Sequence, residues 1–496
     1  MKEQLLLAIL LIMSIVCHAE DITVSYKGAA AKVTRQVEDS VKVNVDGAKV
    51  SIKSLYKSHK LTLRLTGNSS DGQLVLITAG KAEVKLDGLT LTSGEGAPLW
   101  LKNKKKVEIV AVNGTRNTLS VTACNDTANH KGAVIWAKDK VLFSGKGVLN
   151  VVATGDGCRG IKTKKDITVE ELTLNVTTSG NHLGEKPFSF GPQGGFPPFG
   201  GDSIRRDSFP APPGGFPQFG GGFPPFGGDS IKREGMPDFG GEKPDFSGEM
   251  PDFGGGFGGK HKYYASAKGI ASKGRIIINS GSVTVRTATA GAEGIEGKQG
   301  VAFNGGRVDI LSPDDAVNSG GTIEFNGADV TARSTGNDAV DANPKTGFFT
   351  PFGGNNNADS QEADTAIVIR GGTVYAWSQV GSPEEGLDCD FSPIVIEGGF
   401  IFSVGGGMGE MPSVPTNDTA KQPTVLLIGI DIEKDETVSI LDADGKTVRS
   451  VTVPFSLRRS ASLVSSSAFR LGSAYTVKTK GYEKTFTLSE PFTVVR

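Results

Sequence analysis

The chain has 496 residues, a formal net charge of −1 and 37% hydrophobic residues, so it is long enough for a large core or for two to three domains. The near-neutral charge argues against a general nucleic-acid binder and against a binder of anionic membranes, because both need an excess of basic residues. The 68 glycines and 24 prolines predict many tight corners, a low-complexity segment, or both.

Residues 1–19 have the features of a secretory signal peptide. Lys2 supplies a positive start, residues 5–16 form an apolar stretch, and small residues precede a cleavage site after Ala19. We therefore expect a secreted, extracellular protein that has no transmembrane anchor once the signal is cleaved. In a eukaryotic host, Asn-X-Ser/Thr sequons would then predict glycosylation at Asn68, Asn113, Asn125, Asn175 and Asn417.

The mature chain keeps three cysteines, which is an odd number and therefore not a disulfide framework. Cys124 and Cys158 are either bonded across neighbouring turns or are two buried free thiols, and the sequence leaves both alternatives open. The third is Cys389. No spacing of cysteine and histidine indicates a zinc site.

A repeat of about 22 to 25 residues runs along the chain, as the positions of Gly269, Gly294, Ala316 and Ala339 show. Each unit has a glycine-containing corner and an extended run in which apolar residues alternate, as in "SVTVRT" at 282–287. Such a spacing predicts an all-β parallel β-helix. Glycine and asparagine recur at the corners, where we expect left-handed backbone angles.

The repeat divides the chain into segments. After the signal peptide (1–19) we expect an N-terminal β cap at 20–65, a first set of coils at 66–182 and more regular coils at 261–410. A linker at 411–423 leads to a C-terminal β cap or small β module at 424–496. Residues 183–260 are rich in Gly, Pro and Phe and hold thirteen of the 26 phenylalanines. We expect this long insert to be disordered, because it has no aliphatic periodicity with which to build a core.

The stretch "LDGLTLTSGEGAPLWLKNKKKVEIVAVNGTRNTL" (86–119), followed by the glycine-cornered coils and the insert, resembles a family of extracellular carbohydrate-binding β-helix proteins known from cellulose-degrading clostridia. The resemblance covers residues 20 to 485. It implies a right-handed parallel β-helix similar to that of pectate lyases, bound calcium, and partners among plant-type polysaccharides and acidic sugars.

Stacking the corners coil on coil predicts two columns of charged side chains. In neighbouring coils about 4.8 Å apart, like charges repel by about 1 kcal/mol even in water. A cation with oxygen ligands would relieve this repulsion, and Ca²⁺ accepts several such oxygens. We therefore expect calcium as the cofactor, although the acids could instead fan into solvent as turn caps. The candidate ligands are Glu293, Glu296, Asp315, Asn318, Asp338 and Asp341.

Three functions compete. The motif "PDDAVNSG" at 313–320 looks like the double aspartate of pectin hydrolases, but their Gly-His-Gly corner is missing. A calcium-dependent polysaccharide lyase would need Lys268 or Lys298 as a base with a lowered pKa. The leading interpretation is a non-enzymatic binder of extracellular, acidic polysaccharide, with Trp100, Trp136, Tyr375 and Trp377 as sugar-stacking candidates. A structural or adhesive protein that self-associates through the insert is the further alternative.

Overall fold

The computed structural model describes residues 21–36, 40–124, 132–183, 266–343, 366–389, 392, 394–406 and 412–496. All of them belong to one compact unit, which comprises Met1–Gly184 and Tyr263–Arg496. The predicted signal peptide, Asn125 and nearly all of the predicted insert lie outside the described residues. Every regular element in the described part is a strand, so the all-β prediction is confirmed. Within these ranges the chain has no helix that could span a lipid bilayer.

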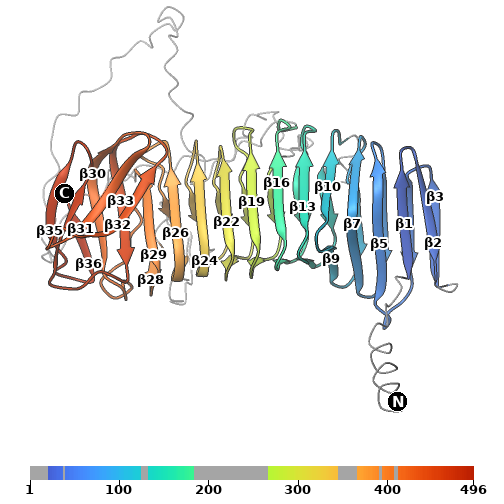
Figure 1. Cartoon of the computed structure of the whole chain (residues 1–496), viewed down its shortest axis with the longest axis horizontal. Helices are drawn as coiled ribbons and strands as arrows, with labels where there is room; N and C mark the ends of the chain where they lie inside the picture. The colour runs from blue at the N-terminus through green and yellow to red at the C-terminus, as the bar shows by residue number, and fades with distance from the viewer. Residues whose placement is uncertain are drawn as a thin grey trace, which may run out of the picture. The chain divides into compact units, whose positions relative to one another are not determined.

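Parallel strands dominate the fold, and they form three ladders that run across successive turns of the chain (Figure 1). The first ladder is an eleven-stranded sheet, closed at one end by an antiparallel hairpin of β3 and β4. Its strands, in spatial order, are β3 (Val41–Asp46), β4 (Lys49–Ser54), β6 (Gln73–Thr78), β8 (Leu99–Asn103), β11 (Ala133–Ala137), β14 (Arg159–Thr163), β17 (Ile270–Ser272), β20 (Ile295–Gly297), β23 (Val317–Ser319), β25 (Val340–Ala342) and β27 (Leu387–Asp388).

The second and third ladders belong to one larger sheet and are joined by four long strands that take part in both. These long strands are β5 (Leu61–Ser69), β7 (Ala82–Ser93), β24 (Ile323–Ser334) and β26 (Ile367–Ser378). The second ladder adds β9 (Val107–Ala111), β12 (Val141–Ser144), β15 (Ile167–Val169), β18 (Ile276–Ile278), β21 (Val301–Phe303) and β28 (Ile394–Ile396). The third adds β1 (Ile22–Lys27), β10 (Arg116–Val121), β13 (Val148–Ala153), β16 (Thr173–Thr178), β19 (Ser282–Thr287), β22 (Arg307–Ser312) and β29 (Phe400–Gly405).

Each regular turn of the chain, which we call a coil, supplies one strand or strand segment to each ladder. The coil of β17, β18 and β19, for example, pairs in parallel with the coil of β20, β21 and β22. Alternate side chains point inward, and valine, isoleucine and leucine fill the interior almost without exposure. Phe303 and Phe325 stack there on neighbouring coils, with ring centroids 5.1 Å apart. The ladders therefore bury an apolar column and leave three outward faces.

The coils on either side of residues 184–265 are direct neighbours. Ile161 of β14 pairs with Ile270 of β17, and Val176 of β16 pairs with Val285 of β19. The chain thus leaves the stack after one coil and re-enters it at the next position without interrupting the ladders. This pairing is what an insert at a corner requires.

Antiparallel strands occupy both ends of the stack. At the N-terminal end, β2 (Ala30–Arg35) pairs antiparallel with β1. At the C-terminal end, β33 (Leu457–Ser466) pairs antiparallel with β29 of the last coil and with β30 (Thr424–Ile432), which also carries β36 (Phe492–Val495). A separate four-stranded sheet contains β31 (Glu436–Asp442), β32 (Thr447–Val453), β34 (Ala474–Lys478) and β35 (Glu483–Thr487). Covered ends are expected, because open ladder edges promote aggregation.

The corner asparagines do not have the left-handed backbone angles that the sequence predicted. Glycines do adopt left-handed angles there, with φ of 90° at Gly281 and 79° at Gly306, but no asparagine among the described residues has a positive φ. The asparagines instead form a side-chain ladder, in which the Asn304 amide donates to Asn279 at 2.8 Å and the Asn326 amide donates to Asn304 at 2.7 Å. Asparagine recurs because its side chain is both donor and acceptor.

Candidate functional site

The outward face of the first ladder carries the predicted column of charged and polar side chains, and strand pairing confirms its register. The members lie on successive coils and are Lys162, Ala271, Glu296, Asn318, Asp341 and Asp388. The second predicted column, which precedes each corner, lies beside it. Between the two columns each coil has a glycine or an alanine, and there the backbones of neighbouring coils lie close together. A Cβ added at Gly294 would lie only 2.6 Å from Ala316 O of the next coil.

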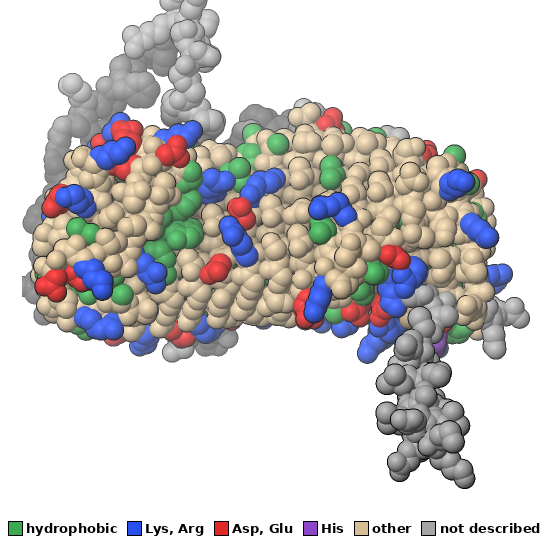
Figure 2. All heavy atoms as spheres, in the orientation of Figure 1, with side chains coloured by type: hydrophobic (Ala, Val, Ile, Leu, Met, Phe, Trp, Pro, Cys, Tyr) green, Lys and Arg blue, Asp and Glu red, His purple; other side chains and the backbone are tan. Residues whose placement is uncertain are grey.

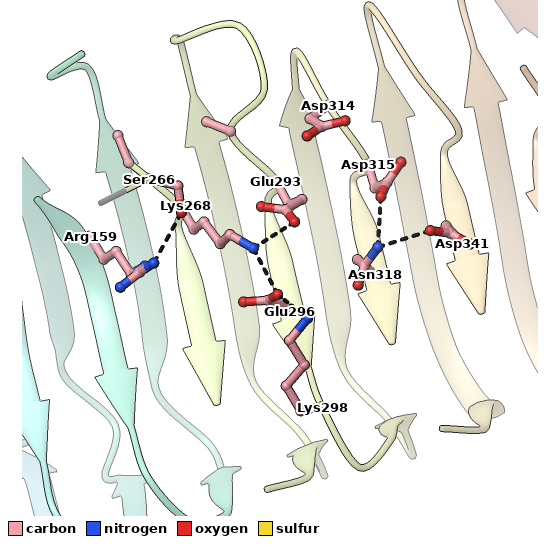
Figure 3. A network of polar contacts seen from close by, with 12 residues as sticks. Arg159, Ser266, Lys268, Glu293, Glu296, Lys298, Asp314, Asp315, Asn318 and Asp341 are labelled. Atoms are coloured by element: carbon pink, nitrogen blue, oxygen red, sulfur yellow. Dashed lines mark hydrogen bonds and ion pairs between the residues drawn. The ribbon is translucent and has the colours of Figure 1, made fainter. Parts of the chain in front are cut away.

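Lys268 lies between two carboxylates of the next coil (Figure 3). Its Nζ is 2.6 Å from Glu293 Oε1 and 2.7 Å from Glu296 Oε1, and all three side chains are largely buried. The exposed Lys298 adds a second ammonium group 2.5 Å from Glu296 Oε1. Two coils of acids and lysines therefore neutralise one another within the chain.

An amide, in place of an ammonium group, links the acids of the next two coils. Asn318 Nδ2 donates to Asp315 Oδ2 at 2.8 Å and to Asp341 Oδ2 at 2.9 Å, as Figure 3 shows. The Asn343 amide donates to both carboxylate oxygens of Asp341. Asp315 and Asp341 are only 4% and 8% exposed, so these hydrogen bonds replace those that water would otherwise donate to the carboxylates.

The last coils continue the acidic surface. Asp338 is 8% exposed and accepts a hydrogen bond from the backbone N–H of Glu385 at 2.5 Å. Ser413 donates from its backbone to Glu385 Oε2 at 2.6 Å and from its hydroxyl to Asp388 Oδ1 at 3.1 Å. Residue 413 lies in the predicted linker, so the linker returns to cover the end of the acidic column.

The environment separates the pKa values of these acids. Burial raises the pKa of Asp315 well above its usual range, and the carboxylates of Asp341, Asp314 and Asp338 raise it further. Burial also raises the pKa of Asp338, to about 9, with a contribution from Asp388. We infer that Asp338 holds a proton at neutral pH.

Glu296 behaves in the opposite way. Burial alone would raise its pKa, but the ammonium groups of Lys268 and Lys298 outweigh burial and hold the pKa at about 2. Burial would lower the pKa of Lys268, yet Glu293 and Glu296 outweigh it and the pKa is raised. A lyase base would need a lowered pKa, so Lys268 does not meet that requirement.

The calcium prediction concerns these same acids. In the part of the chain that the structure describes, no three His, Cys, Asp or Glu side chains are grouped so as to hold a metal ion. Two buried carboxylate oxygens, Glu293 Oε2 and Asp315 Oδ1, have no hydrogen-bond partner. These are the atoms that a cation or a proton would satisfy. The repulsion that suggested a cation is already reduced by lysines, amides and raised pKa values, none of which the stacking argument included.

The aromatic candidates form two pairs. Trp100 and Trp136 are paired by register on β8 and β11, and their rings make an edge contact with centroids 6.1 Å apart. Trp100 is half-buried and Trp136 is 6% exposed. Tyr375 and Trp377 lie on β26, where Trp377 is 7% exposed and donates from Nε1 to Phe402 O at 3.1 Å. Trp377 packs with Phe455 in the C-terminal core.

The cysteine alternative left open by the sequence is settled by the structure, in which Cys124 and Cys158 form a disulfide. Cys389 is buried and takes no part in a disulfide. Among the sequons, Asn68, Asn113 and Asn417 are exposed, whereas Asn175 lies within β16 and donates to Asn150 Oδ1 at 2.9 Å.

A family model described as "Carbohydrate-binding domain-containing protein" matches residues 46–186 and 257–339, which include most of the coils. A carbohydrate-binding domain-containing protein of Acetivibrio thermocellus is 29% identical over 140 residues, and these residues are 27% of this chain and 48% of that protein. The chain thus spans about half the length of that relative. No solved structure is significantly similar to the chain. The expected similarity to carbohydrate-binding proteins is confirmed, and the likeness to polysaccharide lyases stays a prediction.

Proposed function

We propose that this protein is a secreted binder of extracellular, acidic polysaccharide and that its coils wind into a right-handed parallel β-helix. The register of the coils is the observation that carries the proposal. Outward side chains recur at the spacing of about 4.8 Å between neighbouring parallel strands. An extended polysaccharide also presents its groups at a regular spacing, so each sugar can meet an equivalent side chain.

Further observations and one general rule support the proposal. The matched family model and the matched relative are both described as carbohydrate-binding. The Cys124–Cys158 disulfide is typical of proteins that leave the reducing cytosol. Right-handed connections between parallel strands are the rule in proteins. The face in Figure 2, which carries the third ladder, is largely uncharged and polar and has only scattered charged side chains. A surface of this kind can hydrogen-bond to sugar hydroxyls.

Calcium is part of the proposal through the orphaned oxygens Glu293 Oε2 and Asp315 Oδ1. A cation held at Asp315 and Asp338 would require these two acids to ionise and their side chains to move closer together, and it could then bridge them to a uronate. The alternative of a calcium-dependent lyase lacks a base with a lowered pKa at Lys268. The alternative of a self-associating structural protein rests on residues 183–260, which lie almost entirely outside the described residues.

A glycan array tests the proposal when the mature protein is applied with calcium and, separately, with a chelator. We expect retention of linear acidic polysaccharides. Retention of no glycan under either condition would contradict carbohydrate binding. Release of unsaturated, ultraviolet-absorbing products would establish the lyase alternative, and glycan-independent self-association that deletion of residues 183–260 abolishes would establish the structural one.

A further inference from the structure

Lysines at equivalent positions of successive coils form a column at the C-terminal ends of the first-ladder strands. Backbone hydrogen bonds fix its register, since Lys138 N donates to Leu101 O at 2.9 Å and Lys164 N donates to Ala137 O at 3.2 Å. Lys273 N and Lys298 N continue the series to Thr163 O and Ser272 O. Five consecutive coils therefore place an equivalent lysine side by side. The members of this lysine column are Lys102, Lys138, Lys164, Lys273 and Lys298.

The middle of the column is exposed and unneutralised. Lys138, Lys164 and Lys273 are exposed, and none of the three has an ion-pair partner in the described part of the chain. This differs from the adjoining acidic coils, where ammonium groups and amides satisfy most of the carboxylates. Positive charges about 4.8 Å apart repel one another. A bound anion would therefore reduce an electrostatic repulsion that destabilises the free protein.

The aromatic rings of the first two coils lie beside lysines of the column. Lys102 Nζ lies 3.7 Å from the centre of the Trp100 ring, and Lys164 Nζ lies 6.0 Å from that of Trp136. Trp100 and Trp136 precede Lys102 and Lys138 by two residues, so these side chains point to the same face. The half-buried Trp100 ring thus borders the lysine column and limits how far Lys102 can move away.

We propose that the lysine column is a binding site for a linear anionic polysaccharide with one carboxylate or sulfate on each sugar, and that this site needs no calcium. The column runs across the strands, from coil to coil. Its spacing is comparable to the length of one pyranose residue in an extended chain. A polymer lying along the column would bring successive anionic groups to successive ammonium groups. This inference rests on the proposed function, to which it adds the site and the charge of the ligand.

The geometry favours a glycan over a nucleic acid. Phosphates in an extended single strand are spaced more widely than the coils. The column also contains only lysine, whereas bidentate phosphate recognition favours arginine. The chain as a whole has a net charge of −1, so attraction is confined to the column and does not act over the entire surface.

The test compares the mature wild-type protein with two triple variants that change the net charge equally. One is Lys138→Gln, Lys164→Gln and Lys273→Gln in the column. The other is Lys27→Gln, Lys32→Gln and Lys446→Gln, at exposed positions outside it. The probes are polygalacturonate, the same polymer fully methyl-esterified, and a single-stranded oligonucleotide, each in a chelator and, separately, with calcium. Thermal melting confirms that each variant is folded.

We expect the column variant to bind polygalacturonate about ten- to a hundred-fold more weakly than the wild type, with a shallower salt dependence. The control variant should keep wild-type affinity, and the ester should bind weakly to all three proteins. Equal loss in both variants, or binding that requires calcium, would overturn the lysine column as the site. Stronger binding of the oligonucleotide would overturn the glycan as its ligand. Binding of neutral glycans alone would overturn this inference and leave the proposed carbohydrate binding intact.

Discussion

Lys268 Nζ lies 2.6 Å from Glu293 Oε1 on the next coil, and both side chains are more than four-fifths buried. Replacement of Lys268 by Met should therefore leave Glu293 and Glu296 without their buried counter-charge. We expect the free energy of unfolding to fall by about 3–5 kcal/mol, as when one partner of a buried ion pair is removed. Denaturant unfolding measures the change.

Lys273→Met on the same coil is the matched control, since Lys273 is exposed. It should change stability by less than about 0.5 kcal/mol. Adding Glu296→Gln to Lys268→Met removes one of the two buried carboxylates and should recover part of the loss. If Lys268→Met were no more harmful than Lys273→Met, the buried network would contribute nothing to folding.

The acids at 315 and 338 make stability depend on pH. The pKa of Asp338 is raised to about 9 in the folded protein, and that of Asp315 is also raised. The folded state then holds protons that the unfolded state releases above about pH 4. The stabilisation is complete below that pH and is lost as pH rises toward 9, with a slope of up to about 1.4 kcal/mol per pH unit for each group.

Thermal or denaturant unfolding between pH 5 and 9 in a chelator measures this loss. The variant Asp338→Asn should flatten the dependence, since the amide replaces the protonated acid. Calcium reverses the sign if it binds, because its ligands must ionise and stability then increases with pH. The same titration with calcium added therefore tests the metal proposal. A flat profile in the wild type would contradict the raised pKa values.

Glycines with a positive φ should lose less stability on replacement by alanine where no neighbouring backbone lies close to the added Cβ. At Gly306, φ is 79° and an added Cβ would lie 2.4 Å from Gly281 O. At Gly445, in the hairpin turn between β31 and β32, φ is 77° but nothing lies within 4 Å of an added Cβ. We expect Gly445→Ala to cost about 1–2 kcal/mol from the backbone angle alone, and Gly306→Ala to cost about 1–3 kcal/mol more. Equal losses in denaturant unfolding would show that coil contact at the corner is unimportant.

Much of the ladder register could be predicted from the sequence. The spacing of Gly269, Gly294 and Ala316 aligned the corners, and the strand pairs of Ala271 with Glu296 and of Glu296 with Asn318 confirm that alignment. Strict alternation within short runs was sufficient, because a slip of one residue would expose every buried side chain.

The state of the acids could not be predicted in the same way. A pKa depends on burial and on what fills the space between columns, as with Lys268 between Glu293 and Glu296 or Asn318 between Asp315 and Asp341. These contacts join different columns, whereas the sequence comparison took each column by itself. The contact between Ser413 and Glu385 could be predicted even less, because Ser413 lies outside the repeat, beyond the last coil.

The lysine column did have a sequence signal. In each corner the lysine follows the outward residue of the strand by two positions, as Lys298 follows Glu296. The spacing from the outward residue to the lysine is therefore the same in every coil of the column. The asparagine ladder was visible too, but its cause was assigned to backbone angles because the pattern alone does not reveal side-chain hydrogen bonds.

The exposed lysines without an ion-pair partner among the described residues stand on the coils of β11, β14 and β17, whereas the acids from β20 onward are mostly paired with lysines, hydrogen-bonded to amides or protonated. The positive potential of the first ladder is therefore concentrated on one group of neighbouring coils. A polyanion that approaches this face is attracted mainly to these coils. The arrangement of charges on the fold therefore directs an approaching ligand to these coils before any individual contact forms.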